Sequence, residues 1–103
     1  MTLRHIVMFK MNAETEHERD AQAARLVAAL EALPPNIQQI RALSVGVNTV
    51  HRPGNWDVVL TVDVDDEAAL ELYRNHPNHV TVMQLVAQTV AERCAVDFRV
   101  EAA

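Results

Sequence analysis

The sequence predicts an α+β domain with a ferredoxin-like arrangement, in which helices cover one face of an antiparallel four-stranded sheet. Three observations lead to this prediction. Apolar residues alternate in strand-like segments, they recur at helical spacing between those segments, and prolines mark the helix ends. The resulting order is strand, helix, strand, strand, broken helix, strand, which is the βαββαβ order of the split fold. Residues 1–103 fit a single domain of this kind.

The first strand is predicted over residues 2–11. Its middle is apolar on both faces: Val7 and Phe9 share one face with His5, and Ile6 and Met8 share the other. A strand that is apolar on both faces is usually covered on both sides. We therefore expect this strand in the centre of the sheet.

The remaining elements follow from the same signals. Thr15 and Asp65 are candidate helix N-caps, Pro34 and the next proline end the first helix, and Pro77 interrupts the second. In the last strand, Cys94 alternates with charged residues and is predicted to be a small core residue. The expected elements are a helix over residues 15–33, strands over 38–50 and 56–64, helices over 66–75 and 78–91, and a strand over 93–101.

Composition argues against several classes of function. Fourteen acidic residues against nine basic ones give a net charge of −5, and the basic residues form no stripe. We therefore expect neither nucleic-acid binding nor membrane binding. Only two glycines occur, so no phosphate-binding glycine loop is present and we expect no cofactor. The apolar run near the start is too short for a signal peptide, and the single cysteine forms no internal disulfide; both features suggest the cytoplasm.

The sheet face opposite the helices predicts a homodimer. We assign Ile6, Met8 and Val59 to that face, and each large aliphatic side chain left in water forgoes about 2 kcal/mol of burial free energy. Stacking on the same face of a second copy removes this cost. The alternative is an ordinary surface on which apolar residues are merely scattered.

A candidate site lies near the interruption of the second helix. Tyr73, His76 and His79 stand three residues apart there, and His5 lies on the helix-facing side of the first strand. Near neutral pH a histidine can accept a proton while a tyrosine donates a hydrogen bond, which suits proton removal next to a carbonyl. The expected pocket lining is His5, Val7, Phe9, Leu60, His76 and Met83.

Each of these residues also has a structural interpretation. His76 stands directly before Pro77 and is well placed as a helix cap. Tyr73 can be a core aromatic, and His79 can be a solvated residue of a first helical turn. The step between His76 and His79 runs through a proline, unlike the i, i+4 histidine pair of a helical zinc site, so we expect no metal.

Several segments together resemble the stress-responsive dimeric α/β-barrel (Dabb) family over nearly the whole chain. They include Arg4-His-Ile-Val-Met-Phe-Lys10, Val96-Asp-Phe98 and, most specifically, Tyr73-Arg-Asn-His-Pro-Asn-His79. The resemblance implies a ferredoxin-like protomer whose sheet packs on its twofold mate to form a barrel. Most members have no settled activity.

Some plant members of that family are polyketide cyclases that close a ring by an intramolecular aldol reaction. By motif position, the resemblance implies that His79 is the base, that Tyr73 assists it and that His5 lines the pocket. Cyclising members line their pocket with aromatics of the first helix, where this chain has Gln22, Ala23 and neighbouring aliphatic residues. A smaller apolar or phenolic ligand is therefore implied. The alternatives are a non-enzymatic dimeric stress protein and an oxygenase like the related cofactor-independent monooxygenases.

Overall fold

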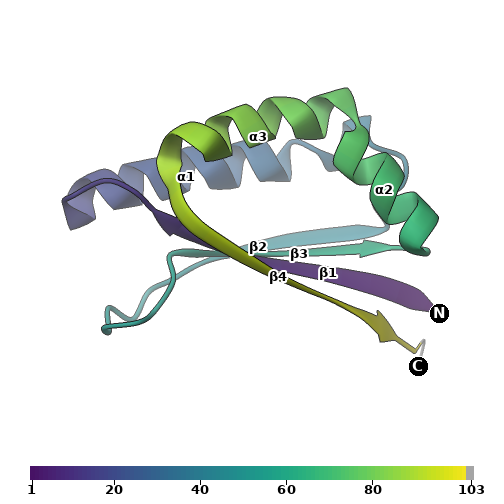
Figure 1. Ribbon diagram of the computed structural model, residues 1–103, viewed down its shortest axis with the longest axis horizontal. Helices are drawn as coiled ribbons and strands as arrows, with labels where there is room; N and C mark the ends of the chain where they lie inside the picture. Colours follow the sequence, from purple (N-terminus) through teal and green to yellow (C-terminus); the bar gives the residue numbers. More distant parts are fainter. Residues whose placement is uncertain (102–103) are drawn as a thin grey trace.

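The computed structural model describes residues 1–101 of the chain and shows one antiparallel sheet with helices on one of its faces (Figure 1). Within these residues the sheet has four strands in the order β2-β3-β1-β4. The ferredoxin-like α+β prediction is confirmed. The elements are β1 (Thr2–Met11), α1 (Glu16–Glu31), the short 3₁₀ helix η1 (Pro34–Asn36), β2 (Ala42–Val47), β3 (Val58–Val64), α2 (Glu67–Asn75), α3 (Pro77–Thr89) and β4 (Val90–Val100).

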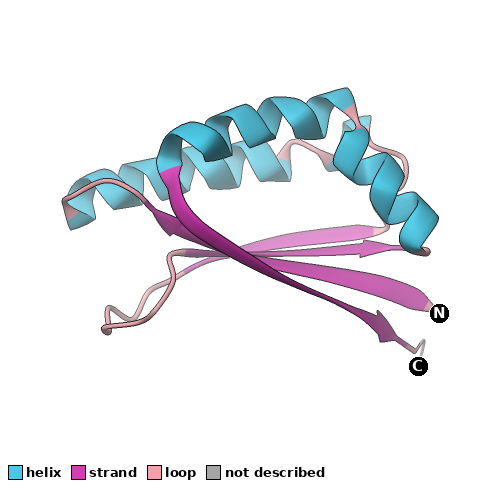
Figure 2. Cartoon of the chain, viewed as in Figure 1, coloured by secondary structure: helices cyan, strands magenta, loops and turns pink. Residues whose placement is uncertain are grey.

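Strand β1 lies in the middle of the sheet, as expected. It pairs with β3 on one side and with β4 on the other, so that Val7 lies opposite both Leu60 and Ala95. Figure 2 shows the helices together on one side of the strands, with the opposite side of the sheet uncovered. We call this uncovered side of the sheet the open face.

The hydrophobic core lies between the sheet and the helices. It is formed by residues that alternate along β1 and β3 and by the apolar stripes of the three helices. These side chains are almost completely excluded from water. The most deeply buried of the large ones are Phe9, Leu26, Leu30, Ile37, Val62, Val64 and Tyr73.

Side-chain caps begin the first two helices. The Thr15 hydroxyl accepts a hydrogen bond from the backbone N–H of Glu18 at 3.1 Å, as predicted. Helix α2 is capped by Asp66 instead of Asp65, because its carboxylate accepts from the N–H of Ala69 at 2.8 Å. The prediction was wrong by one residue, and the carboxylate of Asp65 instead pairs with Arg41 at 2.7 Å.

Strand β2 is shorter than the predicted strand over residues 38–50. Its ladder begins with Ala42 opposite Asp63 and ends with Val47 opposite Val58. Just outside these pairs the N–H of Arg41 still donates to the carbonyl of Asp63, and the N–H of Asn48 donates to that of Asp57. Beyond these bonds the chain leaves the sheet and forms the turn before β2 and the long loop over residues 48–57. The length of the partner strand therefore sets the length of β2.

The prediction for Cys94 was wrong. Cys94 lies opposite Met8, and Val96 lies opposite Ile6, so both point to the open face; Cys94 is exposed. The alternating residues Arg93, Ala95 and Asp97 face the helices instead. Alternation separates the two faces of a strand, but it does not tell which face meets the helices.

The open face carries a continuous apolar surface. Ile6 and Met8 of β1 are flanked by Val59 of β3 and by Val96 of β4, and Phe98 continues the row. In the protomer Met8 is 39% exposed, Val59 37%, Phe98 41% and Val96 64%. No helix in residues 1–101 is long and apolar enough to cross a membrane.

Candidate functional site

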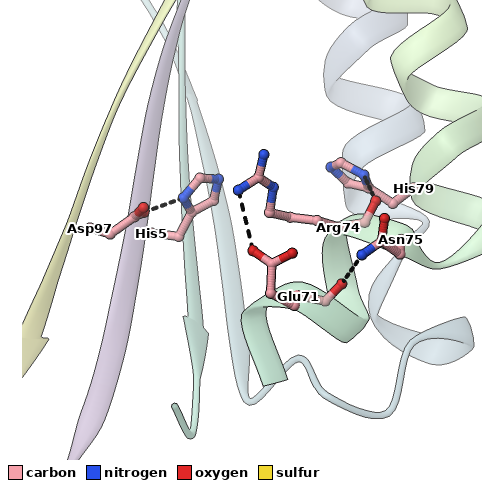
Figure 3. A network of polar contacts seen from close by, with 6 residues as sticks. All are labelled: His5, Glu71, Arg74, Asn75, His79 and Asp97. Carbon is pink, nitrogen blue, oxygen red and sulfur yellow. Dashed lines mark hydrogen bonds and ion pairs between the residues drawn. The ribbon is translucent and has the colours of Figure 1, made fainter. Parts of the chain in front are cut away.

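A small polar cavity lies between the first and last strands and the corner where α2 meets α3. Its volume is about 290 Å³. Figure 3 shows the polar residues that approach it from both sides: His5 and Asp97 come from the strands, and Glu71, Arg74, Asn75 and His79 come from the helices. The lining residues are His5, Glu71, Arg74, Asn75, His79, Met83 and Arg93.

A larger hollow of about 560 Å³ lies between the open face and the loop over residues 48–57. Its lining is mainly apolar and backbone, and it contains neither a histidine nor a tyrosine. Its one acidic residue, Asp57, accepts a hydrogen bond from the N–H of Met11 at 2.8 Å and thereby holds the loop against β1. Volume alone therefore favours this hollow, whereas the two buried histidines, His5 and His79, line the smaller cavity.

The break between α2 and α3 positions His79. In an uninterrupted helix the N–H of Asn78 would donate to the carbonyl of Arg74, four residues earlier. Here Pro77 begins a new helix, and the Asn78 N–H donates to Nδ1 of His76 at 3.1 Å. The carbonyl oxygen of Arg74 instead lies 2.9 Å from Nδ1 of His79. The helix-cap interpretation of His76 is thus confirmed, and the break gives His79 a fixed acceptor.

That hydrogen bond determines the tautomer of His79. A carbonyl oxygen can only accept, so Nδ1 carries the hydrogen and Nε2 keeps its lone pair in the neutral ring. The residue is 9% exposed. Burial lowers the pKa of His79 below its usual value, and the charges of His5 and Arg93 lower it further, while the Arg74 carbonyl acts in the opposite direction. His79 is therefore a neutral proton acceptor near pH 7.

Tyr73 lies beside both histidines. Its ring centroid is 4.6 Å from that of His79 and 6.3 Å from that of His5. The residue is 0% exposed, and its hydroxyl has no hydrogen-bond partner in the described part of the chain. Burial raises the pKa of Tyr73 to about 12, which keeps the phenol protonated. A buried, unpaired donor of this kind costs about 1–3 kcal/mol and calls for an explanation.

His5 is held by a carboxylate from the neighbouring strand. The ladder places His5 opposite Asp97, and Nδ1 of His5 donates to the Asp97 carboxylate. This contact fixes the orientation of the imidazole, as a carboxylate commonly does for a functional histidine. Two histidines with anchored Nδ1 atoms thus lie on the wall of one cavity.

Comparison with known proteins identifies the family. The sequence profile of the stress responsive A/B barrel domain matches residues 3–100. The chain belongs to this family. An uncharacterized protein of Streptomyces coelicolor is 34% identical over 77 residues, which cover 75% of this chain and 78% of the relative.

Solved structures with a ferredoxin-like fold are similar to the A/B barrel protein in sequence and in structure. A dimeric protein of unknown function and ferredoxin-like fold from Bacteroides fragilis is 32% identical, with a TM-score of 0.85 and 96% of each chain covered. A dimeric ferredoxin-like protein of unknown function from Thermobifida fusca is 29% identical, with a TM-score of 0.82 and coverage of 97% of this chain and 92% of the other. Both neighbours are described as dimers, and neither has a stated activity.

The A/B barrel protein brings together only some of the predicted site residues. His5, His79 and Met83 line the cavity, and Tyr73 lies in the core beside the two histidines. The other predicted lining residues lie elsewhere: Val7, Phe9 and Leu60 are buried in the core, and His76 borders a separate hollow next to Leu72. Val7, Phe9 and Leu60 are buried in the core because they lie on the side of the sheet that packs against the helices. The ring of His76 instead accepts the N–H of Asn78.

Sequence reasoning missed the charged residues of the cavity. Glu71 and Asn75 stand four residues apart in α2, a spacing that keeps side chains on one face of a helix, and His79 follows in α3 beyond the break. Arg93 and Asp97 were not considered as site residues, because Cys94 and the apolar residues that alternate with them were expected to face the core. Within residues 1–101, no group of three or more histidine, cysteine, aspartate or glutamate side chains is arranged to hold a metal ion.

Proposed function

We propose that this A/B barrel protein binds a small carbonyl compound beside His79 and removes a proton from the carbon next to its carbonyl group. The observation that carries the proposal is the hydrogen bond from Nδ1 of His79 to the Arg74 carbonyl, which leaves Nε2 as an acceptor. A general base must be unprotonated at working pH, and burial of His79 favours that state. No other histidine in the described residues combines such burial with such an anchor, apart from His5 across the same cavity.

The chemical step transfers one proton. The C–H proton moves to Nε2 of His79, and the electron pair moves into the carbonyl to form an enolate. Tyr73 supports the proposal because its phenol is a protonated donor without a partner, buried next to the base. Because Tyr73 lies behind the cavity wall, its hydroxyl would act on the enolate oxygen through one water molecule and stabilise it. In an aldol closure the enolate carbon then attacks a second carbonyl of the same molecule, and His79 returns its proton to the new alkoxide.

The cavity supports a compact ligand. About 290 Å³ corresponds to about ten non-hydrogen atoms, at the roughly 30 Å³ that each water molecule occupies in the liquid. This volume suits one small phenolic or apolar ring, and it is too small for a long polyketide chain. The absence of aromatics from α1 agrees with such a small ligand.

We further propose that the functional unit is a homodimer, located in the cytoplasm, that joins through the open face. The dimeric state of the relatives supports this proposal, as does the apolar row of Ile6, Met8, Val59, Val96 and Phe98. Two stacked sheets would cover that row on both copies. The exposed thiol of Cys94 on the same face fits a reducing compartment.

A ligand screen tests the site. Small phenols, quinols and β-keto compounds are screened by thermal shift, and hits that contain a ketone are incubated in deuterated water to follow exchange of the α-protons by NMR. We expect exchange to be catalysed by the wild type and to be lost in His79→Ala. His17→Ala, which removes an exposed histidine of α1, is the matched control and should exchange like the wild type. Catalysed exchange that survives in His79→Ala would refute the base role, and the absence of any hit would favour a non-enzymatic dimeric protein.

A further inference from the structure

The cavity beside His79 is cationic in a protein that is acidic overall. The whole chain has a net charge of −5, yet two arginines line the cavity against a single glutamate, while His79 is neutral and His5 is paired with Asp97. That glutamate is already used, because Glu71 lies 3.4 Å from Nη1 of Arg74 in an ion pair. After this pairing, the charge of Arg93 is left uncompensated.

Arg93 reaches the cavity from the last strand. It lies opposite Phe9, on the side of β4 that faces the helices. Its guanidinium contacts the sulfur of Met83 at 3.6 Å, and a thioether is only a weak acceptor. No carboxylate of residues 1–101 lies within ion-pair distance of Arg93. A guanidinium has five donors in a planar fork, so most of the hydrogen-bonding capacity of Arg93 is open to a ligand.

The position of Arg93 also relates it to the proposed chemistry. Burial is the main cause of the shifted pKa of both His79 and Tyr73, and the charge of Arg93 contributes to the field at both groups. Arg93 and His79 line the same cavity, so an anion held by Arg93 would share that cavity with the proton acceptor.

We propose that the ligand of this cavity is a small keto acid whose carboxylate is bound by Arg93. This inference rests on the proposed role of His79 as the base. A carboxylate matches the planar fork of one arginine and carries the single negative charge that one unpaired arginine can balance. A phosphate dianion would need a second free cation, and Arg74 is paired with Glu71.

The carboxylate would also explain why a cation is needed near the base. Removal of a proton from a keto acid produces an enolate next to an existing carboxylate, which gives two negative charges in a confined space. Arg93 neutralises the first of these charges before the second develops, and it thereby lowers the barrier of the step. Arg93 is thus a binding residue for the carboxylate, distinct from His79, which moves the proton.

Paired ligands and paired variants test the inference. The probe is levulinate (4-oxopentanoate), a stable keto acid of eight non-hydrogen atoms, compared with its methyl ester, which keeps the ketone but has no charge. Binding is measured by NMR titration of the protein. We expect the wild type to bind levulinate at least tenfold more tightly than the ester, and Arg93→Gln to lose this preference. Arg99→Gln is the matched control, because Arg99 is on the same strand and also contacts a methionine sulfur, at 3.8 Å, but does not line the cavity.

The outcomes separate this inference from the proposed function. Equal affinity for levulinate and its ester, or unchanged levulinate binding in Arg93→Gln, would overturn the carboxylate assignment. Displacement of levulinate by equimolar inorganic phosphate would overturn the choice of carboxylate over phosphate. The base role is judged separately by deuterium exchange at the ketone α-carbons of either probe, which His79→Gln should abolish while levulinate still binds.

Discussion

The rings of Tyr73 and His79 lie with their centroids 4.6 Å apart and their planes inclined by 54°. One ring is a buried phenol without a partner, and the other is an imidazole whose Nδ1 is anchored to a carbonyl. Tyr73 belongs to the hydrophobic core and His79 lines the cavity, so the two rings join these two parts of the protein. A change in either ring should be detectable both in stability and in the properties of the site.

Removal of the Tyr73 hydroxyl should stabilise the protein. In Tyr73→Phe the ring still fills the core, whereas the unpaired donor is gone, so the free energy of unfolding should rise by about 1 kcal/mol. Urea denaturation followed by far-UV circular dichroism measures this change. The same variant should show slower ketone exchange with unchanged ligand affinity. A loss of stability of about 1 kcal/mol or more would mean that the hydroxyl has a hydrogen-bond partner in solution.

The titration of His79 should affect stability on the acidic side of neutrality. Because burial lowers its pKa in the native protein, the unfolded chain binds more protons than the native chain as the pH falls through about 6.5. The free energy of unfolding contributed by neutral His79 is therefore lost as the pH falls through that range. Below the native pKa of His79, this contribution no longer changes with pH. Urea denaturation at stepped pH should show a shallower pH dependence for His79→Gln than for the wild type.

NMR provides the direct check of that titration. The ring C–H signal of His79 should titrate at a pH below the value of about 6.5 that is usual for an exposed histidine. The titratable or charged groups around the ring are Tyr73, His5, Glu71, Arg74 and Arg93. A midpoint at or above the usual value would contradict the assignment of His79 as a neutral acceptor.

A charge on the open face should separate the proposed dimer. Val96 is 64% exposed in the protomer and lies opposite Ile6, in the middle of the apolar row. In Val96→Asp, formation of the dimer would bury an unpaired carboxylate, so the dissociation constant should rise at least about 100-fold. Analytical ultracentrifugation measures this change. Leu72→Asp is the control, because Leu72 is 59% exposed on α2 and away from the sheet.

The thiol of Cys94 gives an independent measure of the same interface. It is exposed in the protomer and lies opposite Met8 on the open face. If two copies stack there, alkylation should be slow in the wild type and should speed up in Val96→Asp. Equal alkylation rates in the two proteins, at concentrations where the wild type is dimeric, would place the interface elsewhere.

His76 should matter for stability and not for catalysis. Its Nδ1 accepts the N–H of Asn78 and thereby caps α3, so His76→Ala should cost about 1 kcal/mol of unfolding free energy. His76→Asn should restore most of this loss, because asparagine is a strong N-cap residue. Thermal and urea denaturation measure both effects. Ketone exchange that fell in His76→Ala without a matching loss of folded protein would assign His76 a role in the site.

The fold was readable from the sequence because local signals agreed with one another. The alternation in β1, the capping spacing at Thr15 and the proline at position 77 each act within a few residues. Apart from the one-residue shift of the α2 cap, the errors arose where a distant partner decides the outcome. The ends of β2 depend on where β3 ends, and the orientation of Cys94 depends on the register between β4 and β1.

The candidate site was only partly readable for the same reason. The local motif gave Tyr73, His79 and the break between them, and the alternation of β1 placed His5 on the correct face. Arg93 lines the cavity, and Asp97 holds His5 there, only because β4 pairs with β1 over 80 residues away in the sequence. The acceptor for His79 could not be foreseen either, since it is a backbone carbonyl and no residue type reveals it.

The interruption at Pro77 has a consequence for how this protein can change. A substitution that allowed α2 and α3 to merge would give the Arg74 carbonyl back to its regular helical donor, the N–H of Asn78. His79 would then lose its anchor and with it the fixed tautomer of its ring. The carbonyl oxygen of Arg74 can either bond within a continuous helix or hold the imidazole of His79. A substitution that makes the helix continuous would therefore release the ring of the proposed base.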